Sequence, residues 1–178
     1  MLDFLPAPLK GVLVVLLILT NTLIFLPFLL LFAIIKLIIP VKLVRTLCTR
    51  MVNLIAWYWI GFNNTLADLF HKIEWDVRGA RELSKKHWYF VTCNHQSWTD
   101  ITAIQYALNN KIPLLKFFLK KELIWVPLLG VAWWGLDFPF MHRHTKEQIA
   151  RRPELKGKDI EATRKACEKF RYTPVTIF

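Results

Sequence analysis

The residues with the clearest potential for chemistry lie in the short run Asn94-His95-Gln96-Ser97-Trp98-Thr99-Asp100. A histidine followed five positions later by an aspartate can supply a general base and the carboxylate that orients it. Such a carboxylate fixes the tautomer of the imidazole and stabilises the imidazolium that forms when the other ring nitrogen accepts a proton. His95 and Asp100 are therefore candidate catalytic residues.

The spacing alone is weak evidence, because about one chain in six of this length and composition would contain it by chance. His71 and Asp76 have the same spacing. They fall in a segment predicted to be extended, where positions five apart face opposite sides and lie about 16 Å apart. His95 instead leaves a predicted strand and Asp100 opens a predicted helix, so a tight turn can bring the two side chains together.

The proton that the histidine accepts could come from a serine nucleophile or from a substrate hydroxyl. Ser97 is only two residues from His95, and the sequence contains no Gly-x-Ser-x-Gly elbow, which is the usual setting of a hydrolase serine. A substrate alcohol that attacks an activated acyl group is therefore the better fit.

The composition favours a membrane-associated protein. The chain has 178 residues, of which 54% are apolar, and its mean hydropathy is +0.33, which is high for a soluble domain. Lysine and arginine outnumber acidic residues by 24 to 13. Such an excess indicates an anionic partner, either nucleic acid, anionic lipid or a phosphorylated substrate, and the high hydropathy favours lipid over nucleic acid.

An N-terminal membrane anchor is predicted over residues 1–70. Residues 11–35 carry no charge, and this run is longer than the roughly 20 residues that span a hydrocarbon core. A Thr-Asn-Thr triplet at 20–22 and Pro27 leave open a kinked or re-entrant helix. The basic residues that follow place the C-terminal side in the cytoplasm. Residues 51–70, rich in aromatic side chains, fit either a helix at the headgroup level or a core helix.

Residues 71–178 have the pattern of an α/β domain with a largely parallel central sheet. Strands are predicted at 73–78 by alternation, at 88–93 as an interior strand, and at 175–178. Helices are predicted at 101–108 and from a cap at Asp159 to Phe170, with Ile160, Thr163, Cys167 and Phe170 facing inward. Residues 116–122 fit a short basic-aromatic helix or turn, and 124–141 fit strands and loops because of their glycines and prolines.

The His-x4-Asp run resembles the first motif of the glycerolipid acyltransferases, the 1-acylglycerol-3-phosphate acyltransferase family. The run Phe138-Pro139-Phe140-Met141-His142-Arg143 is similar to the second motif of this family, an apolar stretch that ends in arginine. The resemblance implies that Arg143 contacts the phosphate of a lysophospholipid. His142 departs from the aspartate that often precedes this arginine. Together with Ser84-Lys85-Lys86, the second run is most similar to the enterobacterial inner-membrane branch.

The resemblance implies a membrane-bound enzyme of phospholipid biosynthesis. It would transfer a fatty acyl group from acyl-CoA or the acyl carrier protein to lysophosphatidate, without a metal or other cofactor. The catalytic domain would lie on the cytoplasmic side of the cell inner membrane. The third motif of the family, a Glu-Gly-Thr-Arg type loop after a strand, is expected just after Phe178. We therefore expect residues 71–178 to be the N-terminal portion of the domain and part of the site to lie beyond them.

Several alternatives remain open. The acceptor could be another lysophospholipid, such as lysophosphatidylglycerol, or a lipid A precursor. The chain could also be a non-enzymatic, basic membrane-binding protein, whereas no nucleic-acid recognition motif is visible. Arg143 could be one solvated cation on a basic surface. His142 and His144 lack a carboxylate or cysteine at metal-ligand spacing. Cys48, Cys93 and Cys167 fit small buried apolar residues.

Overall fold

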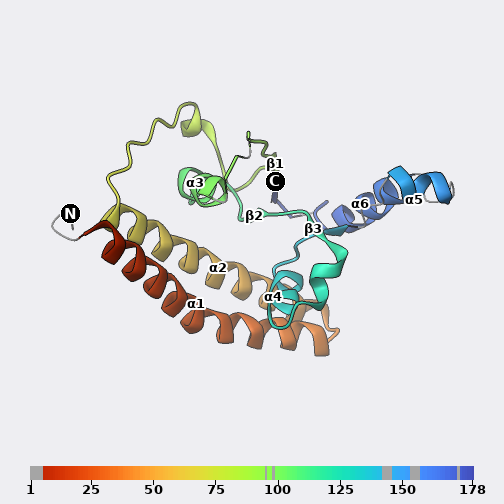
Figure 1. Cartoon of the computed structure of the whole chain (residues 1–178). Coiled ribbons are helices and arrows are strands. Elements are labelled where there is room, and N and C mark those ends of the chain that lie inside the picture. The colour runs from red at the N-terminus through yellow and green to blue at the C-terminus, as the bar shows by residue number, and fades with distance from the viewer. Residues whose placement is uncertain (1–5, 95, 98, 142–145, 153–156, 172) are drawn as a thin grey trace.

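The computed structural model describes residues 6–94, 96–97, 99–141, 146–152, 157–171 and 173–178. Two long N-terminal helices are followed by shorter helices interspersed with short strands (Figure 1). The helices are α1 (Ala7–Ile38), α2 (Lys42–Phe70), η1 (Ala80–Glu82), α3 (Thr99–Leu108), η2 (Lys121–Trp125), α4 (Leu129–Gly135), α5 (Lys146–Arg151) and α6 (Lys158–Glu168). The strands are β1 (Tyr89–Phe90), β2 (Leu115–Lys116), β3 (Leu119–Lys120), β4 (Phe140–Met141) and β5 (Thr176–Ile177).

Helices α1 and α2 form a long hairpin that lies along one side of the molecule (Figure 1). Helix α1 has 32 residues and runs without interruption through Pro27. By length and composition it is the one helix in the described part of the chain that could cross a membrane. The proline and the Thr-Asn-Thr triplet therefore interrupt the apolar run of the sequence without ending the helix.

The Thr-Asn-Thr triplet connects the two helices of the hairpin. Asn21 is 3% exposed, and its Nδ2 donates to the carbonyl oxygen of Trp59 at 3.1 Å and to Oδ1 of Asn63 at 2.9 Å. The indole Nε1 of Trp59 donates to Oγ1 of Thr22 at 3.1 Å. Polar side chains that pair between two apolar helices fix their relative position, because an unpaired polar group there would be costly.

Helix α2 packs one face into the hydrophobic core. Its residues Val52, Ile55 and Ala56 form a buried cluster with Leu29 of α1 and with Ala132 and Leu136 from the region of α4. The opposite face of α2 remains open, with Tyr58 54% exposed. The main hydrophobic core of the protein is therefore shared by the N-terminal hairpin and the segment around α4.

The strands form two small parallel sheets, which confirms the predicted parallel arrangement. One sheet has the order β1-β5-β2 and the other pairs β3 with β4. The C-terminal strand β5, predicted at 175–178, occupies the centre of the larger sheet. Its Thr176 is fully buried and donates through Oγ1 to the carbonyl oxygen of Pro113 at 2.9 Å.

The strand predicted at 73–78 is absent from the described structure. Ile73 and Val77 are 46% and 40% exposed, so the alternating apolar residues face solvent instead of a core. Trp75 stacks on Tyr106 of α3, with ring centroids 4.1 Å apart. This aromatic stack joins the segment to α3, and among the described residues no strand pairs with it.

The strand predicted at 88–93 is shorter than expected and is not interior. Within the described residues β1 covers two positions and pairs on one side only, with β5. Its Phe90 is 73% exposed. A continuous apolar run predicts burial on both faces of a strand. Strand β1 instead lies at the edge of its sheet, and the side chain of Phe90 is exposed to solvent.

The region 124–141 contains a helix where strands and loops were predicted. Helix α4 packs against α1, and β4 follows it. The two glycines that suggested loops are instead required by close packing. A Cβ at Gly130 would lie 2.0 Å from the carbonyl oxygen of Ile124, and a Cβ at Gly135 would lie 2.6 Å from the Cβ of Ala33.

Replacement of Gly135 by alanine is expected to destabilise the protein by about 1–3 kcal/mol, because the new methyl group would press on the buried Ala33 of α1. Gly61→Ala in α2 is the matched control, since nothing lies within 4 Å of its Cβ position. The control should be neutral or stabilising by up to about 1 kcal/mol. Thermal unfolding in detergent measures both variants, and equal midpoints would contradict the close packing of α4 on α1.

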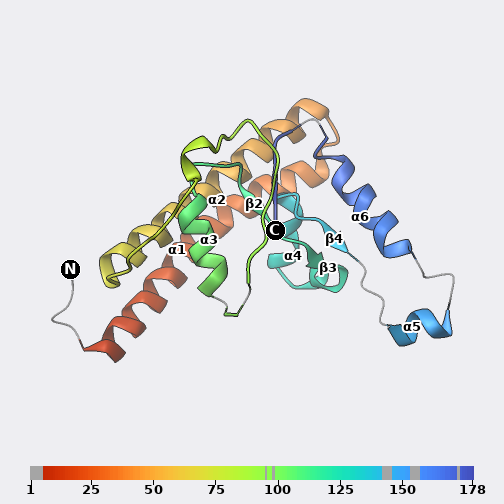
Figure 2. The same cartoon turned by 90° about the horizontal axis from the view of Figure 1, so that it is seen from above.

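Helices α5 and α6 project to one side of the sheets and away from α3 (Figure 2). The predicted last helix is confirmed as α6, but it begins at Lys158 with Gly157 as its N-cap residue instead of Asp159. Cys167 and Phe170 face inward as predicted, whereas Ile160 is 76% exposed.

Candidate active site

Asp100 lies in the first turn of α3 and holds the loop that precedes the helix. Its Oδ2 accepts hydrogen bonds from the backbone N–H groups of Gln96 at 2.6 Å and Ser97 at 2.7 Å. The carboxylate thus contacts the backbone of Gln96, the residue directly after position 95. A carboxylate in the first turn of a helix is also favoured by the partial positive charge of the helix N-terminus.

Ser97 completes the turn into α3. Its Oγ accepts hydrogen bonds from the backbone N–H of Thr99 at 3.3 Å and from the hydroxyl of Thr99 at 3.0 Å. The backbone N–H of Asp100 donates to the carbonyl oxygen of Ser97 at 3.1 Å. These contacts give Ser97 a structural role at the helix start.

The other two predicted site residues, His95 and Arg143, lie outside the described residues. The described chain reaches Asn94 on one side of His95 and Gln96 on the other. It reaches Met141 of β4 before Arg143, where Met141 pairs with Lys120 of β3. The roles of His95 and Arg143 therefore stay predictions.

Asp100 borders a cavity of about 840 Å³ between the helical hairpin and α3. Its walls include Val14 and Ile18 of α1, Trp59 of α2, and Tyr106 of α3. A second, more apolar cavity of about 860 Å³ adjoins the first, since Trp59 and Gln105 line both. The second cavity is lined by apolar side chains of α1, α2, α4 and the β2–β3 region, among them Phe25, Leu29, Ile55, Phe117, Trp133 and Phe178.

A partly buried ionic cluster joins α1 to the segment after α4, and the sequence did not predict it. Lys36 in the last turn of α1 is 6% exposed, and its Nζ donates to Oδ2 of Asp137 at 2.7 Å and to the carbonyl oxygen of Gly135 at 2.9 Å. Lys169, directly after α6, approaches Oδ1 of Asp137 at 3.5 Å. Lys116 of β2 is also buried and donates to the carbonyl oxygen of Leu136.

The charges in this cluster shift one another's pKa values. Burial alone would raise the pKa of Asp137, but the ammonium group of Lys36, followed by those of Lys169 and Lys116, holds that pKa below its usual value. Burial lowers the pKa of Lys116 to about 8, with Asp137 opposing the shift and Lys169 and Lys36 adding to it. Burial likewise lowers the pKa of Lys169.

One signal in the sequence pointed to this cluster. Asp137 is the only charged residue in the run 124–141, and Lys36 is the first charge after the uncharged run 11–35. A charge inside a long apolar run requires a partner when the run is buried. Two such charges of opposite sign could have been paired on this basis, although nothing in the sequence brings positions 101 residues apart together.

The cysteines agree only in part with their predicted role as small buried residues. Cys48 of α2 is buried, whereas Cys93 is exposed and Cys167 of α6 is half-buried. Cys93 follows β1 at the sheet edge, so its exposure has the same cause as that of Phe90. In the described ranges no group of three histidine, cysteine or acidic side chains could hold a metal ion.

Comparison with known proteins gives one match. The Acyltransferase family model matches residues 74–172, more than half of the chain, and this range contains the His-x4-Asp run and the apolar run that ends at Arg143. No curated protein and no solved structure matches the chain. The match confirms the acyltransferase domain expected from the two motifs. On the strength of this match, the chain belongs to the acyltransferase family.

Proposed function

We propose that this protein is a membrane-bound acyltransferase that moves a fatty acyl group from a thioester to the free hydroxyl of a lysophospholipid, with lysophosphatidate as acceptor and phosphatidate as product. The donor is acyl-CoA or the acyl carrier protein. The family match supports acyl transfer in general, and the choice of acceptor follows from the resemblance of the two motifs to glycerolipid acyltransferases.

In the proposed reaction His95 accepts the proton of the acceptor hydroxyl while the hydroxyl oxygen attacks the thioester carbonyl carbon. The tetrahedral intermediate collapses with cleavage of the carbon–sulfur bond. The imidazolium then returns its proton to the leaving thiolate, so the products are an ester and a free thiol. Asp100 orients the imidazole and stabilises the imidazolium, and no serine intermediate is required.

The observation that carries this proposal is that Asp100 forms hydrogen bonds with the loop next to position 95. Two short hydrogen bonds to the backbone of Gln96 and Ser97 fix the loop relative to the carboxylate. A general base performs best when its orientation is set before the substrate arrives. A carboxylate that both holds this loop and starts a helix supports such preorganisation.

The surroundings of Asp100 suit an acyl substrate. Asp100 lines the first of two adjoining cavities, and apolar side chains of the helical hairpin line both. We propose that an acyl chain lies in this space while its reacting end reaches Asp100 and His95. Helix α1, which is long and apolar enough to span a membrane, would anchor the enzyme in the cell inner membrane with the catalytic domain on the cytoplasmic side.

Arg143 is proposed to hold the phosphate of the acceptor. A guanidinium group can donate two parallel hydrogen bonds to a phosphate, which gives both affinity and orientation. Strand β4 ends at Met141, two residues before Arg143 in the sequence. Lys120 of strand β3, which pairs with Met141, is exposed. Assignment to the enterobacterial branch of the family is part of the same proposal.

Purified full-length protein is expected to transfer an acyl group from acyl-CoA to lysophosphatidate, and Asp100→Asn should lower kcat by about 10²-fold. Asparagine can still accept the backbone hydrogen bonds of the loop but cannot stabilise an imidazolium. Asp76→Asn is the control, because Asp76 is the exposed partner of Arg78 and belongs to the other histidine–aspartate pair of the same spacing. Its activity should equal that of the wild type.

A panel of acceptors and donors in the same assay separates the alternatives. Product formed only with lysophosphatidylglycerol or a lipid A precursor would replace the proposed acceptor and keep the mechanism. Binding of lipid without turnover for any acceptor, unchanged by Asp100→Asn, would contradict the enzymatic function and favour a membrane-binding protein. Comparison of acyl-CoA with acylated carrier protein as donor identifies the donor.

A further inference from the structure

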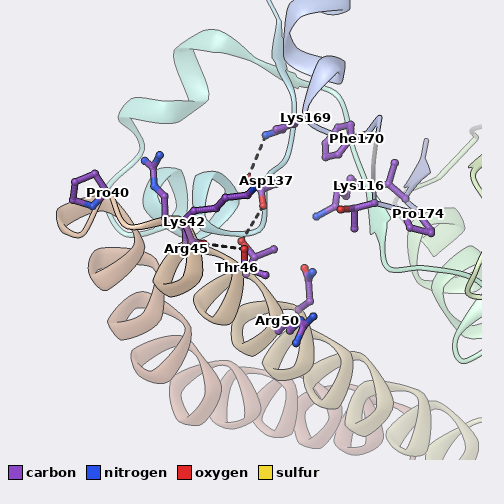
Figure 3. A pocket seen from close by; sticks show the side chains of 14 residues that line it. Pro40, Lys42, Arg45, Thr46, Arg50, Lys116, Asp137, Lys169, Phe170 and Pro174 are labelled. Carbon is purple, nitrogen blue, oxygen red and sulfur yellow. Dashed lines mark hydrogen bonds and ion pairs between the residues drawn. The ribbon is translucent and has the colours of Figure 1, made fainter.

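A third cavity has a volume of about 480 Å³. It is enclosed by the first half of α2, the segment that enters β5, and the end of α6 (Figure 3). None of its lining residues belongs to either cavity beside Asp100. It is therefore separate from the two cavities proposed to hold the acyl chain.

The walls of this cavity are strongly basic. Lys42, Arg45 and Arg50 of α2, Lys116 of β2 and Lys169 after α6 line it, together with one carboxylate, Asp137. Figure 3 shows these side chains arranged around the cavity from three separate parts of the chain. The cationic side chains around this cavity repel one another. A bound anion offsets this repulsion.

The single carboxylate does not balance the cations. Asp137 is already engaged by Lys36, which lies behind the cavity wall, and by Lys169. In the part of the chain that the structure describes, Lys42 and Arg50 form no ion pair. Arg45 donates from Nε to a backbone carbonyl oxygen, that of Lys36, at 3.3 Å. Arginine and lysine side chains around the cavity are therefore available to an anion.

Lys116 is the most deeply placed cation of the cavity. It is 6% exposed, donates to the carbonyl oxygen of Leu136, and lies over the ring of Phe170 at 5.8 Å from the centroid. The charged groups that face it are Asp137, Lys36 and Lys169. The buried positive charge of Lys116 has two further cations and only one shared carboxylate around it. An anion in the cavity would compensate this charge.

Asn53 of α2 adds a neutral polar group to the same wall. Its Oδ1 is buried, and among the residues that the structure describes it has no hydrogen-bond partner. Buried polar atoms are nearly always paired, so an unpaired one marks a place for a water molecule or a ligand. A hydroxyl group next to a phosphate, as in a glycerophosphate, could donate to this oxygen.

We propose that this cavity is a second anion site, which binds a phosphate group separately from acyl transfer. Arginine and lysine side chains from several elements are the usual ligands of phosphate, and arginine can bind it with two parallel hydrogen bonds. The phosphate is either free or part of an anionic phospholipid headgroup. Bound there, it bridges α2, β2 and the end of α6.

Calorimetric titration of the full-length protein in zwitterionic detergent with inorganic phosphate tests the site directly. The variant Arg50→Gln/Lys169→Gln should bind phosphate about tenfold more weakly or worse, because two charge-assisted contacts are lost. Arg164→Gln is the control, since it removes an exposed charge from α6 outside the cavity and should leave the affinity unchanged. Arg50→Gln alone, on the exposed face of α2, replaces the double variant if that one unfolds.

The pH dependence adds an independent readout. The pKa of Lys116 is lowered to about 8 by burial, so this side chain loses its proton as the pH rises above 8, where inorganic phosphate is already a dianion. Phosphate affinity should therefore fall as the pH rises through about 8 in the wild type. In Lys116→Met the affinity should be weaker and should fall less over the same range, because the remaining fall comes from Lys169, whose pKa burial also lowers.

Short-chain phosphatidylglycerol and short-chain phosphatidylcholine distinguish the two sources of phosphate. If the ligand is a lipid headgroup, phosphatidylglycerol raises the thermal midpoint of the wild type but not of Arg50→Gln, and phosphatidylcholine has no such effect. If the ligand is free phosphate, inorganic phosphate alone produces the difference. No binding of either, or an equal loss in Arg164→Gln, overturns the proposal. Because binding is measured without turnover, these outcomes do not depend on whether the protein transfers acyl groups.

Discussion

Replacement of His95 by alanine is expected to abolish acyl transfer from acyl-CoA to lysophosphatidate, with a loss of about 10²- to 10⁴-fold in kcat. The substitution removes the imidazole that we propose accepts the proton of the attacking hydroxyl. The Michaelis constant for the acceptor should change little, because the histidine acts on the reacting atoms and not on the phosphate. A steady-state assay with radiolabelled or chromogenic thioester measures both parameters.

The control for this experiment is His87→Ala. His87 is exposed and lies before β1, and its backbone N–H donates to the carbonyl oxygen of Ser84, a bond that survives the substitution. Its variant should have wild-type activity. Full activity in His95→Ala would eliminate the histidine as general base, whereas a rise in the Michaelis constant at constant kcat would reassign it to binding of the acceptor.

Substitution of Asp137 by asparagine is expected to lower the free energy of unfolding by about 3–5 kcal/mol. The change leaves Lys36, whose side chain is 8% exposed, with its charge buried and uncompensated. Asparagine is the sharpest probe because Asp137 has a φ of 61°, and asparagine, like aspartate, tolerates this left-handed conformation. The substitution therefore removes the charge without straining the backbone. Thermal or chemical unfolding in detergent measures the loss.

Asp76→Asn again supplies the comparison, since it breaks an ion pair with Arg78 in which the side chains are 70% and 87% exposed. Exposed pairs contribute about 0–1 kcal/mol, so this variant should unfold close to the wild type. The double variant Lys36→Met/Asp137→Asn should recover part of the loss, because it removes both buried charges. Equal losses for Asp137→Asn and Asp76→Asn would show that the buried pair does not stabilise the fold.

Predictions from sequence succeeded where a local pattern decides the structure. The uncharged run 11–35 forms a long helix, cap-type residues at Thr99 and Asp100 start α3, and the apolar residues at the C-terminus form a strand. In each of these segments the residues that set the structure are neighbours in sequence. The family match over 74–172 likewise agrees with the motifs around positions 95 and 138–143.

The predictions that were wrong depended on what lies next to a segment in space. Alternation at 73–78 describes a strand only if another strand pairs with it, and none of the described residues does so. Gly130 and Gly135 suggested loops, yet they permit the contacts of α4 with Ile124 and with Ala33. The partner of Lys36 is 101 residues away. Local spacing carries no information about such distances, and so the ionic cluster was not predicted.

The contact between α1 and α4 shows that the first helix is a packed element of the fold as well as a hydrophobic segment. A tether can be exchanged for any other hydrophobic segment of the same length. Helix α1 instead presents Ala33 to Gly135, Lys36 to Asp137 and Asn21 to α2 at fixed positions along its length. A foreign transmembrane helix would match its hydropathy and miss all three contacts. Natural variation in α1 should therefore be free on its exposed side and restricted at these three positions, like that of a core element.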